Sequence, residues 1–156
     1  MKKTNAARLL DARGVYYELL EYEVDETDLS VAKLALKINQ NIEQIFKTLV
    51  LRGDRTGVLV VVVPGNFEVD LKKVAKISGN KSAAMVHQKE LLPLTGYIRG
   101  GCSPLGMKKP YPVYIHVSCL QFGLIYISGG QRGMQIRLSP LDLIEITGAV
   151  AGDVAE

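Results

Sequence analysis

A glycine-rich segment holds the residues of this chain that are best suited to chemistry. It runs from Gly96 to Gly106 with the sequence GYIRGGCSPLG. The Gly100-Gly101 pair and Pro104 turn the backbone sharply and expose its amide groups. Exposed N–H groups can hold a carbonyl oxygen, an oxyanion or a phosphate. The alternative is a tight connection between two strands, which spacing alone slightly favours.

Two other segments carry polar groups suited to a pocket. Lys47 lies at the apolar start of an expected strand, FKTLV, where its ammonium group would be partly desolvated and directed at a cavity. An edge-strand lysine that discourages aggregation is the alternative. The second segment, SGGQRG at 128–133, is a glycine-rich turn with a basic residue. It either meets the first loop over one cleft or forms only a hairpin.

The cysteines and histidines offer weaker candidates. Cys102 lies in the glycine-rich loop, but no base is evident beside it, so a nucleophilic thiol is disfavoured. Cys119 is expected at a strand end as a packing thiol. His87 and His116 are distant in sequence and are interpreted as structural or surface residues.

The motif content excludes several function classes. The chain has no GxSxG, Walker, HExxH or Rossmann motif. It also has no CxxC pair or Cys/His cluster, so we expect neither a metal nor another cofactor. A disulfide between its two cysteines stays open at this point.

Composition is that of an ordinary globular protein. The 156 residues fit one compact domain, with 47% hydrophobic residues, 22% charged residues and a formal net charge of +3. That charge allows an anionic partner without requiring one. The basic N-terminus lacks the apolar stretch of a signal peptide, and the most apolar run, 58–63, is far shorter than the ~20 residues of a membrane span. We therefore expect a cytoplasmic protein.

Periodicity and capping residues predict a mixture of helices and strands. Helices are expected at 4–13, 31–37, 71–77 and 139–146, with short helical turns at 42–44 and 87–92. Strands are expected at 15–22, 46–51, 57–63, 83–86, 113–117, 124–128 and 134–138. The strand at 57–63 is apolar on both faces and should lie centrally. Because helices and strands do not alternate strictly, an α+β domain around a mixed sheet is expected.

Four motifs carry a resemblance to a known family. They are FKTLV at 46–50, DLKKVAK at 70–76, GYIRGGCSPLGMKK at 96–109 and SGGQRG at 128–133. In this order and combination they resemble the YbaK/EbsC family of aminoacyl-tRNA deacylases, which is related to the editing domain of prolyl-tRNA synthetase. The resemblance covers nearly the whole chain, 1–156, as a single domain. It implies a mixed β-sheet curved into a barrel-like core with helices around it.

The resemblance also implies an activity and its partners. It implies removal of cysteine from mischarged Cys-tRNA(Pro), with Cys-tRNA(Cys) as a further candidate substrate. The tRNA acceptor end and prolyl-tRNA synthetase, bound transiently, are the implied partners. The family's essential lysine falls on Lys47, its pocket tyrosine on Tyr22, its loop glycine on Gly100 and its pocket serine on Ser128. Gln135 stands where some members have an acidic residue.

The resemblance also implies a mechanism that needs no nucleophile from the protein. It implies that the thiol of the cysteinyl ester attacks its own carbonyl, that the tRNA leaves, and that water opens the cyclic thioester, so the first step would formally be a cyclising elimination. The Gly100 and Gly101 amides would position the carbonyl oxygen. Lys47 would bind the terminal adenosine or its phosphate, or stabilise negative charge.

Further residues complete the expected site. The expected substrate contacts are Tyr22, Thr48, Ser103, Ser128, Gly129 and Gln135. The expected tRNA contacts are Arg99, Lys108, Lys109 and Arg132. Two alternatives remain: a deacylase for another small amino acid such as alanine, and a non-catalytic module that binds an aminoacyl-nucleotide or tRNA.

Overall fold

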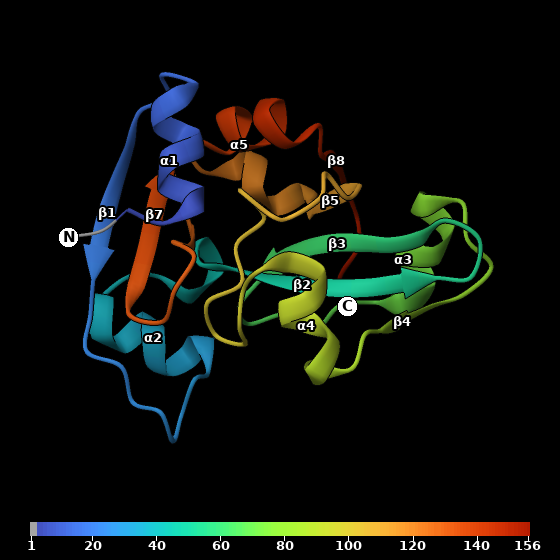
Figure 1. The fold of residues 1–156 in the computed structure, drawn as a ribbon, viewed down its shortest axis with the longest axis horizontal. Coiled ribbons are helices and arrows are strands. Elements are labelled where there is room, and N and C mark those ends of the chain that lie inside the picture. Colours follow the sequence, from blue (N-terminus) through green and yellow to red (C-terminus); the bar gives the residue numbers. More distant parts are fainter. Residues whose placement is uncertain (1–2) are drawn as a thin grey trace.

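The computed structural model describes residues 3–156, which form two separately hydrogen-bonded β-sheets with helices around them (Figure 1). The smaller sheet, on the left of Figure 1, is antiparallel and has the order β1 (Tyr17–Glu21), β7 (Met134–Leu138), β6 (Ile125–Ser128). The larger sheet has the order β4 (Ala83–Met85), β2 (Phe46–Gly53), β3 (Gly57–Pro64), β5 (Val113–His116), β8 (Val150–Gly152).

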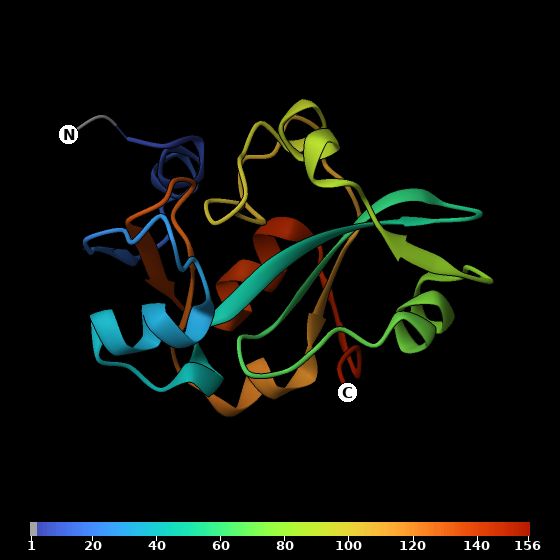
Figure 2. The same cartoon turned by 90° about the horizontal axis from the view of Figure 1, so that it is seen from below.

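The hairpin of β2 and β3 is the longest feature of the larger sheet. The two strands pair antiparallel from Phe46 opposite Pro64 to Gly53 opposite Gly57. Strand β3 pairs with β5 on its other side in parallel, so it is central, as its two apolar faces predicted. Figure 2 shows the hairpin running from the α2 side of the molecule out to the end where α3 lies.

The relation between the sheets leaves one expectation unconfirmed. A single isolated bridge, Ile45 with Tyr126, connects them just before β2 begins. Over residues 3–156 the ladders do not close on themselves, so the barrel-like core is not confirmed. The α+β class and the mixed sheet are confirmed, because β5 and β8 pair in parallel while the hairpin pairs antiparallel.

The helices begin where the sequence provides capping side chains. Thr4, Ser30, Asp70 and Ser139 each accept a backbone N–H at a helix start. The helices are α1 (Asn5–Ala12), α2 (Val31–Ile38), α3 (Leu71–Ser78), α4 (Gln88–Thr95) and α5 (Pro140–Thr147), with 3-10 turns η1 (Ile42–Gln44) and η2 (Val117–Gln121). None of the helices described between residues 3 and 156 is long and apolar enough to cross a membrane.

One local expectation was wrong, and one strand was missed. Cys119 lies within η2 rather than at the end of a strand, because His116 caps a 3-10 turn there. The sequence analysis also missed β8, whose three residues pair with β5 only after the chain has passed through α5. Both cysteines are buried and free.

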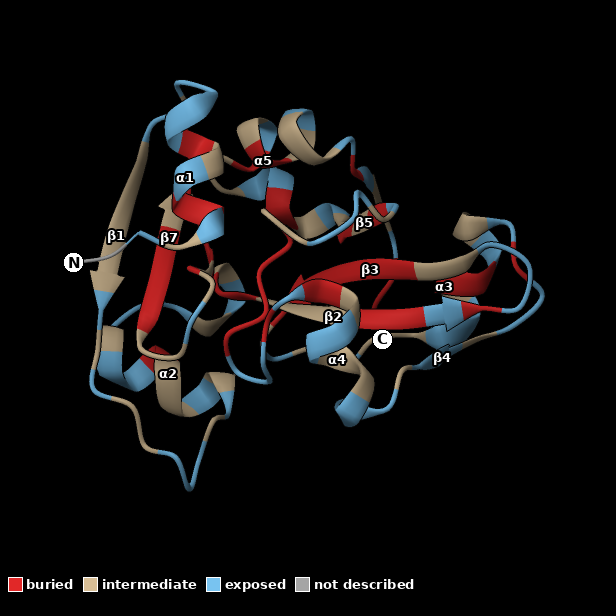
Figure 3. Cartoon of the chain, in the orientation of Figure 1, coloured by how far each residue is buried: buried red, intermediate tan, exposed pale blue. Residues whose placement is uncertain are grey.

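Most of strand β3 is buried (Figure 3), and buried residues pack against both of its faces. Val60 and Val62 pack into the main core with α1, β6, β7 and α5. Val61 and Val63 point the other way, into a second core that includes Val74 of α3 and the C-terminal segment. This alternation fixes the register of β2, which borders the cleft described next.

Candidate active site

A cavity of about 580 Å³ lies where the two sheets approach each other. Its wall includes β2, the start of α2, the segment before α4, the glycine-rich loop and the adjacent ends of β6 and β7. The cavity is large enough for a small aminoacyl ester and part of a nucleoside. The predicted site residues that line it are Tyr22, Lys47, Thr48, Arg99, Gly100, Ser128, Arg132 and Gln135.

Lys47 enters the cavity wall from β2. It pairs with Val63 in the ladder, and its side chain is only 22% exposed. Its ammonium nitrogen lies 3.8 Å from a carboxylate oxygen of Glu68, which follows β3 and lines the same cavity. The position thus combines a partly desolvated cation with one nearby carboxylate.

The ends of β6 and β7 bring Ser128 and Gln135 together. These residues are direct partners in the antiparallel ladder, and Gln135 is 3% exposed. Gln135 Oε1 and Thr48 Oγ1 are both buried without a hydrogen-bond partner among residues 3–156. A buried polar atom without a partner typically costs about 1–3 kcal/mol, and such atoms are often found at functional sites.

Of the two amides expected to hold the substrate oxygen, those of Gly100 and Gly101, only that of Gly100 is open. Gly100 has φ +83° and lines the cavity, and its N–H has no acceptor among the described residues. Gly101 donates its N–H to the Ile98 carbonyl at 2.9 Å, is buried and does not line the cavity. Its expected role in holding the substrate oxygen was therefore wrong, because the turn itself uses that donor.

The two glycine-rich turns meet, as one of the two sequence interpretations expected. Arg132 donates from Nε to the Arg99 carbonyl at 2.8 Å and pairs with Glu26 at 2.5 Å. A Cβ atom on Gly101 would lie 3.0 Å from the Cα of Gln131. Arg132 thus joins the two loops, and its guanidinium already has protein partners.

Most of the chain matches the sequence model of a known protein family. This sequence model describes the aminoacyl-tRNA editing domain and matches residues 26–146, which contain most of the cavity wall.

The chain belongs to this editing-domain family.

Relatives of this editing domain support the assignment along the chain. EbsC of Enterococcus faecalis, assigned provisionally as a Cys-tRNA(Pro)/Cys-tRNA(Cys) deacylase, is 47% identical over 146 residues, which cover 94% of this chain and 89% of EbsC. The proline–tRNA ligase of Thermosipho africanus is 32% identical over 80 residues, covering 51% of this chain and 14% of the ligase. A crystal structure assigned, again provisionally, as a trans-editing enzyme for prolyl-tRNA synthetase superimposes with TM-score 0.86 at 26% identity, covering 100% of this chain and 99% of that one.

Several predicted contacts of the editing domain lie outside its cleft. Ser103 is fully buried and accepts the Leu105 N–H at 3.2 Å, so its hydroxyl stabilises a turn. Gly129 is covered by Met134, to whose carbonyl it donates its N–H. Both expectations of substrate contact were therefore wrong. Lys108 and Lys109 are exposed beyond the cavity wall, and tRNA contact by them stays a prediction.

The cleft of the editing domain also has walls that sequence reasoning missed. The start of α2 contributes Leu29 and Val31, and the segment before α4 contributes Met85 and His87. No local pattern marks these residues, because they reach the cavity only through tertiary packing. Cys102 lines the cavity too, but burial raises its pKa to about 12, so its thiol stays protonated and is a poor nucleophile.

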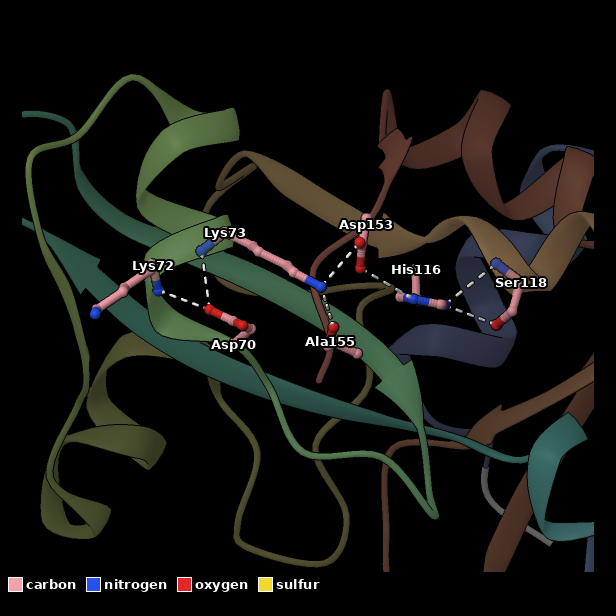
Figure 4. Close-up of polar contacts among 7 residues, drawn as sticks. All are labelled: Asp70, Lys72, Lys73, His116, Ser118, Asp153 and Ala155. Carbon is pink, nitrogen blue, oxygen red and sulfur yellow. Dashed lines mark hydrogen bonds and ion pairs between the residues drawn. The ribbon is translucent and has the colours of Figure 1, made fainter.

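A second polar cluster of the editing domain superficially resembles a catalytic triad (Figure 4). His116 Nδ1 lies 2.9 Å from Ser118 Oγ, and Nε2 lies 3.6 Å from an oxygen of Asp153. However, Nδ1 also accepts the Ser118 backbone N–H at 3.2 Å, as expected of a helix cap. None of these three residues lines the main cavity, so the cluster has a structural role. No group of three or more His, Cys, Asp and Glu residues between 3 and 156 is arranged to hold a metal.

Proposed function

We propose that this protein removes cysteine from mischarged Cys-tRNA(Pro). One observation carries the proposal: the Lys47 ammonium and the open Gly100 amide line the same cavity, within an editing-domain fold. The name of EbsC, at 47% identity, supports cysteine as the amino acid. Cys-tRNA(Cys), which that name also includes, is the second candidate substrate.

The proposed reaction uses the thiol of the substrate. The sulfur attacks the ester carbonyl and forms a C–S bond, while the bond from the carbonyl carbon to the ribose oxygen breaks. The thiol proton passes to the departing ribose oxygen, which leaves as a hydroxyl, and a four-membered cyclic thioester remains. Water then opens that ring to release cysteine. The protein contributes orientation and charge stabilisation, which suits a cleft whose one thiol stays protonated.

Each cleft residue has a role in this proposal. Gly100 donates its N–H to the ester carbonyl oxygen as negative charge develops there. Lys47 binds the terminal phosphate or stabilises the same charge. Ser128 and Tyr22 limit the volume beside the amino acid. The unpartnered oxygens of Thr48 and Gln135 lie where polar groups of the substrate would supply hydrogen-bond donors.

The proposed partners are the acceptor end of the tRNA and prolyl-tRNA synthetase. The match to a proline–tRNA ligase supports the second, since that ligase contains a related segment. The cavity wall also carries three basic residues, Lys33, Lys37 and Arg99. These would contact the backbone phosphates of the tRNA acceptor end, next to the aminoacyl ester. A few such contacts give weak binding, so a transient complex with the synthetase would supply effective concentration.

The test is release of cysteine, serine and alanine from the same tRNA(Pro). Serine differs from cysteine only in its hydroxyl, which is a much weaker nucleophile than a thiol. We expect cysteine to be released fastest, with serine and alanine near the uncatalysed rate. Equal release of serine would contradict thiol assistance, and release of alanine alone would reassign the substrate. No release from any of these tRNAs would favour a binding module.

A further inference from the structure

The carboxylate of Glu68 is positioned to act on Lys47. Its oxygen lies 3.8 Å from the Lys47 ammonium, and both residues line the cavity. Among residues 3–156, no other acidic side chain lies within ion-pair distance of Lys47. The Glu68 side chain is itself 82% exposed, so it can leave this position without disturbing the core.

The backbone beneath Glu68 is held from outside the cleft by the C-terminal segment. The Glu68 carbonyl accepts the Glu156 N–H at 3.0 Å, and Val69 forms a bridge with Ala155. One residue further on, Asp70 donates its N–H to the Val154 carbonyl at 2.9 Å. The last residues of the chain therefore fix the segment that carries Glu68.

A polar clasp fastens this C-terminal segment in turn (Figure 4). Lys73 of α3 binds a carboxylate oxygen of Asp153 at 2.9 Å and the Ala155 carbonyl at 3.0 Å. The other oxygen of Asp153 faces His116, the cap of η2. The clasp thus joins α3, β5 and the chain end, and the Glu68 side chain extends from this fixed backbone with 82% of its surface exposed.

We propose that Glu68 is a positioning residue that keeps the Lys47 ammonium directed into the cleft until substrate replaces it as the partner. This inference rests on the proposed function above. An exposed carboxylate at 3.8 Å makes a weak ion pair, and weakness is what an exchangeable partner requires. A buried and hydrogen-bonded pair would instead be too stable for the substrate to replace Glu68 as the partner of Lys47.

Two measurements on Glu68→Gln test this inference. The first follows the motion of the Lys47 side chain by NMR relaxation of lysine-labelled protein, with a Lys47→Met sample to assign its resonances. Because loss of the carboxylate removes the partner that holds the ammonium, the Lys47 side chain should become more mobile in Glu68→Gln. Glu145→Gln removes an exposed carboxylate of α5 outside the cleft and should leave the motion of the Lys47 side chain unchanged.

The second measurement is the kinetics of Cys-tRNA(Pro) release. Glu68→Gln should lower kcat by about two- to five-fold, the range that matches an exposed ion pair, without raising KM. Glu145→Gln should change neither constant. An Asp153→Asn variant, which weakens the clasp, should shift kcat in the same direction as Glu68→Gln.

The two measurements separate failure of this inference from failure of the proposed function. If Glu68→Gln leaves the motion of the Lys47 side chain unchanged in a protein that releases cysteine, the pairing is overturned and the function stands. If that motion increases but wild-type protein releases no amino acid, the pairing is supported and the proposed function is overturned. A raised KM with unchanged kcat would also overturn the positioning role.

Discussion

Gly100 occupies a left-handed backbone conformation at the edge of the cleft. Its φ is +83°, and a Cβ atom there would lie 3.3 Å from both Arg132 Nε and Leu29 Cδ1. A side chain would thus strain the backbone and also push against both sides of the loop junction. The amide that we assign to the substrate carbonyl depends on this geometry.

Gly100→Ala should therefore lose activity out of proportion to stability. Left-handed backbone costs a residue with Cβ about 1–2 kcal/mol in the free energy of unfolding. A misdirected amide should reduce cysteine release by about 10- to 100-fold. Gly14→Ala is the matched control, because Gly14 has φ +66°, no atom within 4 Å of the added Cβ, and a place outside the cleft. Equal activity losses in the two variants would refute the role of the amide.

The residues of the site differ in how far sequence could reveal them. Lys47 and Gly100 could be found because each breaks a local pattern, a charge in an apolar strand and a glycine pair in a loop. The sequence could not reveal that the Gly101 amide is unavailable to the substrate, because this depends on one hydrogen bond within the turn, to the Ile98 carbonyl. Leu29 and His87 carry no local signal, because α2 and the segment before α4 reach the cleft only after folding.

Elements were predictable where the cause of the element is local. The capped helix starts and the β2–β3 hairpin follow from side chains within a few residues, so their positions were confirmed. The split into two sheets and the strand β8 depend on pairings between distant segments. Periodicity carries no information about such pairings. The barrel-like core was implied by the resemblance alone, and two ladders that do not close leave it unconfirmed.

His116 caps η2 and faces Asp153 of the C-terminal segment, and its protonation makes the stability of the protein depend on pH. Burial is the largest cause that lowers its pKa below the usual 6.5, and Lys73 adds to it, whereas Asp153 opposes both. As the pH falls, His116 therefore takes up a proton in the unfolded chain before it does so in the folded protein. Stability linked to His116 is fully present above about pH 6.5 and is lost as the pH falls through its lowered value.

His116→Asn should reduce this pH dependence. The Asn side-chain oxygen can still accept the Ser118 N–H, but it does not titrate. Urea unfolding near about pH 7 and about pH 5 should show a smaller loss of unfolding free energy in the variant than in wild type. An identical loss in both proteins would show that His116 does not contribute.

The proposed function requires the whole molecule to bring an anionic substrate to a cavity with mixed charges at its edge. Asp25, Asp28 and Glu68 stand on the wall together with Lys33, Lys37 and Arg99. Because the formal net charge is only +3, we expect the protein to attract tRNA through a few local contacts rather than through its overall field.

The KM for tRNA should therefore rise with salt, with a shallow slope. Each lost phosphate contact reduces the slope of log affinity against log salt by about 0.7–0.9. Lys33→Gln should produce one such reduction, whereas Lys89→Gln, on the exposed part of α4 outside the cleft, should produce none. A slope that both variants leave unchanged would place the RNA elsewhere on the surface.

The most direct test of the account is the single-turnover rate of cysteine release from Cys-tRNA(Pro) by Lys47→Ala. Lys47→Ala should fold normally and lose about 100-fold or more in rate, as expected when one charge-stabilising group leaves an active site. Lys89→Ala, which removes an exposed lysine outside the cavity wall, should release cysteine at the wild-type rate. A folded Lys47→Ala protein that releases cysteine as fast as wild type would contradict the assignment of this cleft as the site of the reaction.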